Sequence, residues 1–142
     1  MGDYGIILVS HGELCHGLYQ TAEIVFGTLE NVAAVPFKQN QPLEAYKEEL
    51  LDALERYGYN SIILADLFAG TPFNLLLNIG KETRLNAVCG MNLSMLIAAL
   101  DMRSMGRKPE EVLEELCIAG RDGIKNITEY IDRIRQKIEE KR

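Results

Sequence analysis

The feature of this chain that most constrains its fold is the alternation of short apolar runs with longer stretches of helical spacing. The runs are residues 4–9, 32–37, 61–66 and 86–90. The first is nearly continuous and rich in β-branched side chains, as expected for a strand buried on both faces of a sheet. Crossover helices between successive strands make such a sheet mostly parallel. We therefore predict an α/β fold, a three-layer sandwich with a mostly parallel central sheet and helices on both faces.

Apolar residues at three- and four-residue spacing predict the helices between and after these strands. One helix is predicted directly after the first run. The other predicted helices are residues 42–57, 71–80, 93–100, 109–119 and 121–140. Pro42 and Pro109 suit the first turn of a helix, which supports two of these starts.

The C-terminal segment, residues 121–142, carries a row of isoleucines on a charged background. The row consists of Ile124, Ile127, Ile131, Ile134 and Ile138, at spacings of three, four, three and four. A strand would place alternate residues on one face, and these do not alternate, so the row predicts a C-terminal helix. Because the row covers only about two heptads, this helix must pack on its own sheet or on a second subunit.

Composition limits the classes of protein to which the chain can belong. Its 142 residues, 47% hydrophobic and 25% charged, fit a single domain over residues 1–142 and exclude general disorder. The formal charge is −6, and residues 1–120 carry 8 basic against 16 acidic side chains, so no nucleic-acid partner is expected. No apolar run approaches the roughly 20 residues that span a bilayer, and no signal peptide is expected. Three widely spaced cysteines suit free thiols in a reducing cytoplasm.

Polar residues stand close behind three of the predicted strands. His11 follows the first, Asp66 ends the third, and Asn92 comes shortly after the fourth. The carboxyl ends of parallel strands share one edge of the sheet, where the sites of such folds gather. A histidine side chain has an unperturbed pKa of about 6.5, so much of it is neutral imidazole able to act as a nucleophile. Asp66 is suited to bond one ring nitrogen of His11 and leave the other free, as the orienting carboxylate of a catalytic triad does.

A helix start is predicted just after Asp66. Thr71 suits the N-cap and Pro72 the first helical position, so the backbone N–H groups of Phe73 and Asn74 would point toward an anion. Asn92 is a second N-cap candidate. Taken singly, these features equally fit a loop histidine without a role and helices that are merely well capped.

Together, a neutral imidazole, an orienting carboxylate and an anion-binding helix start meet the needs of phosphoryl transfer to histidine. The expected catalytic residues are His11 and Asp66, with neither a metal nor a cofactor. Phosphate loops, dinucleotide-binding turns and nucleophile elbows are absent from the sequence. His11 and His16 are five residues apart, which is not a metal-ligand spacing on a helix, so His16 is expected at the surface.

Four motifs occur in a fixed order along residues 4–127: VSHG at 9–12, ADLFAGTPFN at 65–74, GMNL at 90–93 and GRDG at 120–123. This set resembles the IIA domains of the mannose-type (mannose/fructose/sorbose) sugar phosphotransferase system, and the second motif is the most specific. The resemblance implies that His11 takes a phosphoryl group on Nε2 from the phosphocarrier HPr and passes it to a IIB domain, which phosphorylates sugar during uptake. It also implies that Asp66 bonds the other ring nitrogen and that Thr71 lies near the phosphoryl group.

The resemblance and the strand ends together define the expected site. The residues expected around the phosphoryl group are Gly12, Gly70, Thr71, Phe73, Asn74 and Asn92. An apolar partner surface is expected at the rim, with Leu67, Phe68 and Met91; the alternative places Leu67 and Phe68 in the core.

The resemblance further favours a homodimer, a cytoplasmic location and only indirect contact with the membrane, through the transporter. In the family a final strand can be exchanged between subunits, whereas residues 121–140 are predicted to be helical here. A second departure is Ser94, which stands where the family often has proline. Two other functions remain open. One is a regulatory module of the same fold that senses phosphorylation state; the other is the phosphotransfer subunit of a dihydroxyacetone kinase, against which the run at residues 70–74 argues.

Overall fold

A four-stranded parallel sheet forms the centre of the molecule in the computed structural model, which describes residues 3–142. The strands are β1 (Ile6–His11), β2 (Val32–Phe37), β3 (Ile62–Ala65) and β4 (Asn86–Val88). Their spatial order is β2-β1-β3-β4, and every neighbouring pair is parallel. The register sets His11 opposite Phe37 and Val9 opposite Ala65, so β1 extends beyond β3 at the carboxyl edge.

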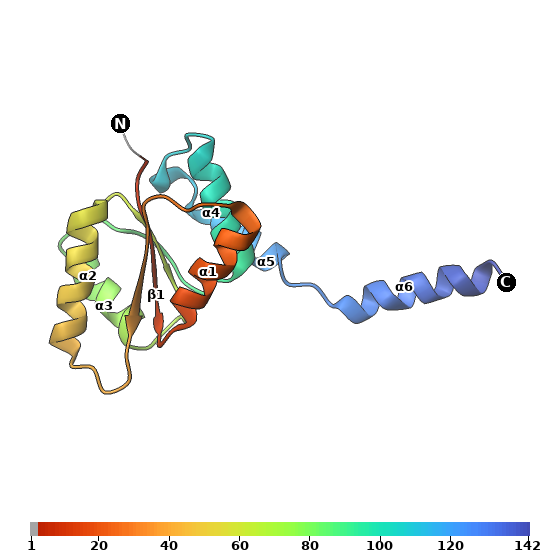
Figure 1. Ribbon diagram of the computed structural model, residues 1–142, viewed down its shortest axis with the longest axis horizontal. Coiled ribbons are helices and arrows are strands. Elements are labelled where there is room, and N and C mark those ends of the chain that lie inside the picture. The colour runs from red at the N-terminus through yellow and green to blue at the C-terminus, as the bar shows by residue number, and fades with distance from the viewer. Residues whose placement is uncertain (1–2) are drawn as a thin grey trace.

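Helices cover both faces of this sheet (Figure 1). On one face lie α1 (Leu14–Phe26), α4 (Leu93–Ser104) and α5 (Leu113–Asp122), the last preceded by a short 3₁₀ turn at Pro109–Glu111. On the other face lie α2 (Leu43–Tyr57) and α3 (Thr71–Gly80). The prediction of a three-layer α/β fold is thus confirmed.

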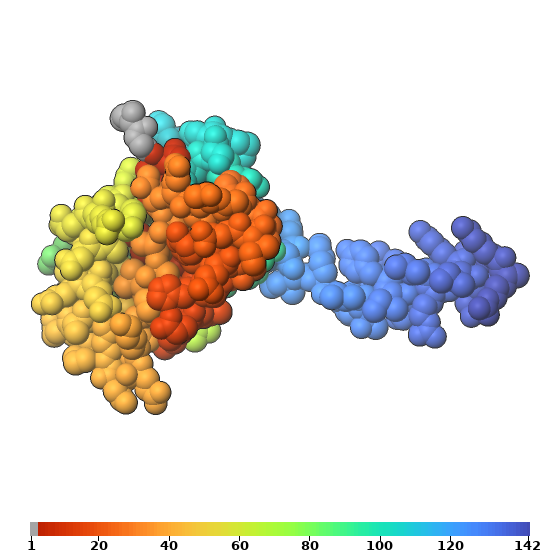
Figure 2. Space-filling model, viewed as in Figure 1, coloured from red at the N-terminus to blue at the C-terminus, as the bar shows by residue number. Residues whose placement is uncertain are grey.

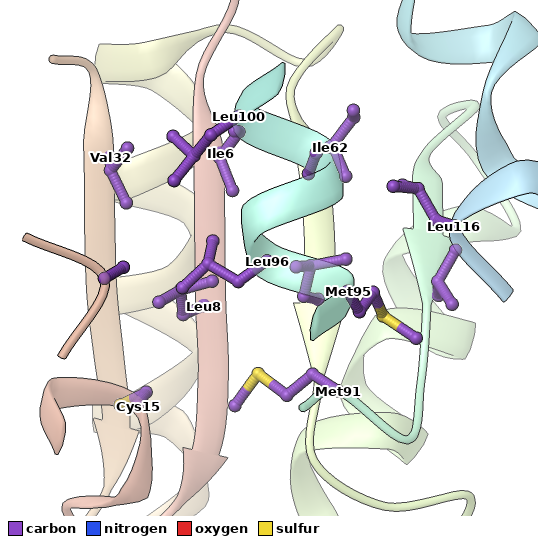
Figure 3. Packing of buried hydrophobic residues seen from close by; sticks show 14 of the residues in the cluster. Ile6, Leu8, Cys15, Val32, Ile62, Met91, Met95, Leu96, Leu100 and Leu116 are labelled. Carbon is purple, nitrogen blue, oxygen red and sulfur yellow. The ribbon is translucent and has the colours of Figure 1, made fainter. Parts of the chain in front are cut away.

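Alternate residues of β1 point to opposite faces and enter separate cores. Ile6 and Leu8 pack with α1, α4 and α5, whereas Ile7 and Val9 pack with α2 and α3. Figure 3 shows the first of these cores, in which Leu96 of α4 lies over the strands. The continuous apolar run of β1 therefore follows from burial on both faces. Within residues 3–142, no helix is both long enough and apolar enough to cross a bilayer.

The C-terminal segment differs in part from its prediction. Helix α6 (Ile127–Glu140) confirms the helical part, but residues 121–122 belong to α5 and residues 123–126 form a non-helical link. Figures 1 and 2 show α6 projecting away from the sheet and its helices, and all of residues 121–142 are exposed. Packing on its own sheet, one of the two expected arrangements, is therefore not what this chain adopts.

The link between α5 and α6 follows from close packing at its start and a cap at its end. A side chain at Gly120 would begin 2.9 Å from the methyl carbon of Met95, and one at Gly123 would collide with Ser94. The GRDG motif thus lets α5 lie against the first turn of α4. Asn126 then caps α6, because its Oδ1 accepts the N–H of Thr128 at 3.1 Å.

Candidate functional site

The candidate site lies where the two central strands end. His11 is the last residue of β1, and Asp66 follows directly after β3. The chain then leaves β1 into α1 on one face and β3 into α3 on the other, the arrangement beside which the sites of such folds are found. Residues 55 positions apart in sequence therefore meet, as the pattern of strands predicted.

A single oxygen of Asp66 holds His11 twice. Oδ2 accepts the backbone N–H of His11 at 2.9 Å and lies 2.9 Å from ring Nδ1. The other oxygen, Oδ1, accepts the N–H of Leu67 at 2.9 Å. The carboxylate is thus anchored to its own loop while it fixes both the main chain and the ring of His11.

Electrostatics set the tautomer of this pair. Burial would raise the pKa of the Asp66 carboxyl, but hydrogen bonds from the backbone and ring of His11, the positive charge that this ring carries when protonated and the Leu67 N–H hold the pKa below 3.8. An ionised carboxylate only accepts, so Nδ1 carries the proton and Nε2 keeps its lone pair. The Asp66 side chain is 8% exposed and that of His11 is 42% exposed, so the nucleophilic edge faces solvent while its anchor does not.

The start of α3 lies against that nucleophilic edge. A side chain at Gly70 would begin 2.8 Å from Nε2 and 2.7 Å from Cε1 of His11. Gly70 and Ala69 both have positive φ, +91° and +126°, and the second value is unusual for a residue with a side chain. This bent backbone brings the helix terminus close to the imidazole.

Helix α3 covers the predicted residues 71–80, but its cap lies one residue earlier than predicted. Gly70, not Thr71, occupies the N-cap, and Thr71 is the first residue of α3. The N–H of Asn74 consequently donates to the Gly70 carbonyl at 2.9 Å and is not available to an anion, contrary to prediction. Because proline lacks an N–H, the donors that the helix geometry leaves free are those of Gly70, Thr71 and Phe73.

Two residues expected at the site have structural roles in this molecule. Asn92 caps α4 as predicted, since its Oδ1 accepts the Met95 N–H at 2.9 Å, and its Nδ2 donates to the Gly120 carbonyl at 2.9 Å. Both ends of this amide are thereby engaged in fixing the start of α4 against α5. Met91 was expected on the partner surface, but it is 7% exposed and packs in the core beneath α4 (Figure 3). Met91 comes shortly after β4, and the face of the sheet covered by α1, α4 and α5 buries its apolar side chain, so it is not available to a partner.

The other two rim residues are exposed. Leu67 is 57% and Phe68 is 78% exposed, so the alternative that places them in the core is wrong. The Phe68 ring leans on that of Phe73 in α3, with centroids 4.9 Å apart. These side chains form an apolar rim beside a polar centre.

Residues near His11 that sequence reasoning did not single out also shape the site. Phe37, at the end of β2, presents its ring edge-on to the imidazole with centroids 6.5 Å apart, and its carbonyl accepts the N–H of Gly12 at 2.8 Å. The hydroxyl of Ser10 bonds the Gly12 carbonyl at 2.8 Å. In the sequence, only two facts could have pointed to these residues: Ser10 directly precedes His11, and Phe37 ends the second predicted strand. His16 is exposed and pairs with Glu13, away from Asp66.

Comparison with known proteins places these features in a family. The family model described as the PTS system fructose IIA component matches residues 5–117. The fructose-specific EIIA component of Bacillus subtilis is 29% identical over 101 residues, 69% of each chain. The sorbose-specific EIIA component of Lacticaseibacillus casei is 29% identical over 94 residues, covering 65% of this chain and 68% of that protein. The mannose-specific EIIAB component of Escherichia coli K12 is 27% identical over 123 residues, 84% of this chain but 38% of that longer protein.

Solved structures agree with the sequence comparisons. The EIIA component from Streptococcus agalactiae superposes with a TM-score of 0.81 at 25% identity, covering 88% of this chain and 98% of that one. The mannose/sorbose-specific IIA subunit from Enterococcus faecalis gives 0.79 at 26% identity, covering 88% and 95%. Since the family model spans most of the chain and the fold is shared, this protein belongs to the mannose-type IIA family of the sugar phosphotransferase system.

Proposed function

We propose that this protein is a phosphocarrier in which Nε2 of His11 accepts a phosphoryl group from phospho-HPr and passes it to a IIB domain. Membership of the family supports the general role in sugar phosphotransfer. One observation supports the specific assignment to His11. Asp66 Oδ2 contacts both the backbone N–H and ring Nδ1 of His11, which orients the ring and leaves Nε2 as its free nitrogen.

The proposed transfer balances without a proton leaving the ring. The Nε2 lone pair attacks phosphorus in line as the bond from phosphorus to the donor breaks. Nδ1 keeps its proton, which stays hydrogen-bonded to Asp66. The positive charge that develops on the imidazole is stabilised by that carboxylate, whose low pKa keeps it ionised at neutral pH.

The incoming phosphoryl oxygens would meet the start of α3. The free N–H groups of Gly70, Thr71 and Phe73 and the positive end of the helix dipole favour an anion there. Gly70 gives the group room, because its lack of a side chain leaves the space next to Nε2 open. Gly12 contributes by shaping the turn, since its φ of +60° carries the chain from His11 toward α1.

The test is phosphorylation of the purified chain by phosphoenolpyruvate, enzyme I and HPr. The expected product is an acid-labile mass increase of one phosphate, lost in His11→Ala and kept in a variant of the other histidine, His16→Ala. Phosphate on His16 in the His11→Ala protein would refute the assignment. Onward transfer to a IIB domain distinguishes a carrier from a module that only senses phosphorylation.

The apolar rim is proposed as the surface that meets both phosphocarriers. Direct transfer requires the partners to approach without a water-filled gap. Leu67 and Phe68 are exposed in the loop that directly follows Asp66, and they suit such a transient contact.

A homodimer is proposed to cover α6. The row Ile127, Ile131, Ile134 and Ile138 is 48–69% exposed, and an isolated helix of 14 residues is marginal in water. Thr128, Tyr130, Arg135 and Lys137 flank this row, so two α6 helices side by side would set basic groups against each other. Residues 1–120 have a net charge of −8, whereas residues 121–142 have +2. The C-terminal segment 121–142 as a whole thus complements the globular part of a second copy in net charge, although α6 itself (Ile127–Glu140) carries three basic and four acidic side chains.

A groove along the edge of the sheet offers a place for it. The groove measures about 740 Å³ and runs between α3 and the edge strand β4, lined by Phe73, Leu76, Leu77, Ala87 and Cys89 among others. Light scattering of the full chain should give a dimer at micromolar concentration. The double change Ile131→Glu and Ile134→Glu should give a monomer in which Cys89 is alkylated faster, whereas Arg133→Glu, on the polar side of α6, should stay dimeric. A monomeric wild-type chain would refute the dimer.

A further inference from the structure

Ser10 directly precedes the proposed phosphoryl acceptor, and it is fully buried although it is polar. Its hydroxyl donates to the Gly12 carbonyl at 2.8 Å and accepts the backbone N–H of Cys15 at 2.9 Å. We propose that Ser10 is a positioning residue: these two hydrogen bonds hold the turn that carries His11 and so set the place of Nε2. This inference rests on the proposed function of His11.

The turn depends on hydrogen bonds more than on packing. Gly12 has φ +60°, and no heavy atom of residues 3–142 outside its neighbours lies within 4 Å of where its side chain would begin. Its N–H is held by the Phe37 carbonyl at 2.8 Å, and its own carbonyl by Ser10. Without the bond from the Ser10 hydroxyl, the turn would be held only by the Gly12 N–H, which donates to Phe37 in β2.

The same hydroxyl also fixes the start of α1. Glu13 occupies the N-cap, and within residues 3–142 its side chain makes no capping bond to that helix. Cys15 lies in the first turn, where N–H groups lack helical acceptors, and Ser10 supplies the acceptor from the preceding strand. One oxygen atom thereby joins the end of β1, the turn and α1.

The remaining contacts cannot replace this link. The thiol of Cys15 lies 3.9 Å from the Gly12 carbonyl, and a thiol is a weak donor. Asp66 would still accept the backbone N–H of His11, but the turn would be free to shift relative to α1, and this shift would lengthen the contact between Nδ1 and Oδ2 that selects the Nδ1–H tautomer. Because displacements of about 1 Å can cost about 100-fold in rate, a smaller shift predicts a loss of about 10- to 100-fold.

The experiment compares Ser10→Ala with a matched control, Ser61→Ala. Ser61 is also fully buried, and its hydroxyl donates to the Gly58 carbonyl at 2.6 Å, at the opposite end of the sheet where β3 begins. Three quantities are measured on the full chain: Tm, the rate of phosphorylation by phospho-HPr, and the fraction of His11 in the Nδ1–H tautomer from ¹⁵N NMR. We expect both variants to lose Tm. Only Ser10→Ala should lose rate, in kcat rather than in KM, and show a smaller Nδ1–H fraction.

The outcomes separate this inference from the proposed function. A Ser10→Ala protein that transfers at the wild-type rate, or a Ser61→Ala protein that slows equally, overturns the positioning role. If the wild-type chain takes no phosphate, the proposed function fails, and the tautomer fraction alone decides the inference: an unchanged fraction in Ser10→Ala overturns it. If Ser10→Ala does not fold, Ser10→Cys, which fills the site with a slightly larger side chain and weakens both bonds, takes its place with the same expected direction.

Discussion

Replacing Gly70 by alanine tests the closest approach in the site. The new Cβ would lie 2.7 Å from Cε1 and 2.8 Å from Nε2 of His11, against at least 3.4 Å in ordinary contact. The imidazole would have to retreat by about 0.7 Å, away from the start of α3, and the methyl group would occupy the space proposed for the phosphoryl group. We expect phosphorylation of His11 to slow by about 100-fold or more.

The cost in stability can be separated from the cost in rate. Gly70 has φ +91° and ψ 176°, a region that essentially only glycine adopts and where a side chain costs about 1–3 kcal/mol, whereas alanine regains about 0.4–1 kcal/mol by restricting the unfolded chain. The backbone contribution is thus a net loss of roughly 1 kcal/mol, or about 2–4 °C in Tm for a chain of this size. Gly106→Ala is the matched control, because Gly106 has φ +77° and open space within the described structure where its side chain would begin.

The assay is the initial rate of phosphate incorporation from phospho-HPr, with Tm measured on the same samples. Both variants should lose a similar amount of stability from backbone strain, and Gly106→Ala should keep the wild-type rate. A Gly70→Ala protein that transfers within a factor of three of wild type would show that the approach of Gly70 to Nε2 has no part in transfer. An equal slowing of Gly106→Ala would likewise show that backbone strain, and not the approach to Nε2, causes the loss of rate.

Three further substitutions test neighbouring parts of the site. Asp66→Asn should slow phosphorylation of His11 by orders of magnitude in the same assay, because an amide lacks the charge and can turn a donor toward Nδ1. Folding lowers the pKa of Asp66 below 3.8, so the ionised carboxylate stabilises the fold above pH 3.8 and this stabilisation is lost as the pH falls through the folded pKa. The urea midpoint of Asp66→Asn should therefore change less than that of wild type between about pH 5 and pH 3. Ala69→Gly should raise stability by about 1 kcal/mol, because relief of the strain at φ +126° exceeds the entropy cost of glycine; a lower urea midpoint would contradict this. Phe68→Ser should raise KM for phospho-HPr while it costs about 1 kcal/mol or less, and a large fall in Tm would assign Phe68 to the core.

The layers and the central pair of residues could be predicted because both follow from periodicity. A run that is apolar at every position can be buried only between two layers, and Ile6 to Val9 divide between the two cores as that requires. Once strands are parallel, their carboxyl ends share an edge, so His11 and Asp66 were expected to meet. The sequence order of the strands did not specify that β1 and β3 would be neighbours, and only the structure supplies the order β2-β1-β3-β4.

The details of the helix starts depend on backbone angles that residue type does not determine. Ala69 adopts a φ that favours glycine, so the bend before α3 had no signal in the sequence, and the cap fell on Gly70 in place of Thr71. A methionine such as Met91 can lie either at an apolar rim or in the core, and in this fold tertiary packing buries it in the core. The isoleucine row predicted a helix correctly, but periodicity describes a face and not its partner, so the isolation of α6 could not be foreseen.

The shared acceptor Asp66 Oδ2 has a consequence for the direction of transfer. Since one atom holds both the backbone N–H and the ring of His11, the imidazole is locked to its own main chain, and under the proposed function it has no need to rotate between loading and unloading. A proton that remains between Nδ1 and the carboxylate in both steps gives the forward and reverse reactions the same path. Under the proposed function, the direction of flow is then set by which partner is phosphorylated, as expected of a relay that works by microscopic reversibility.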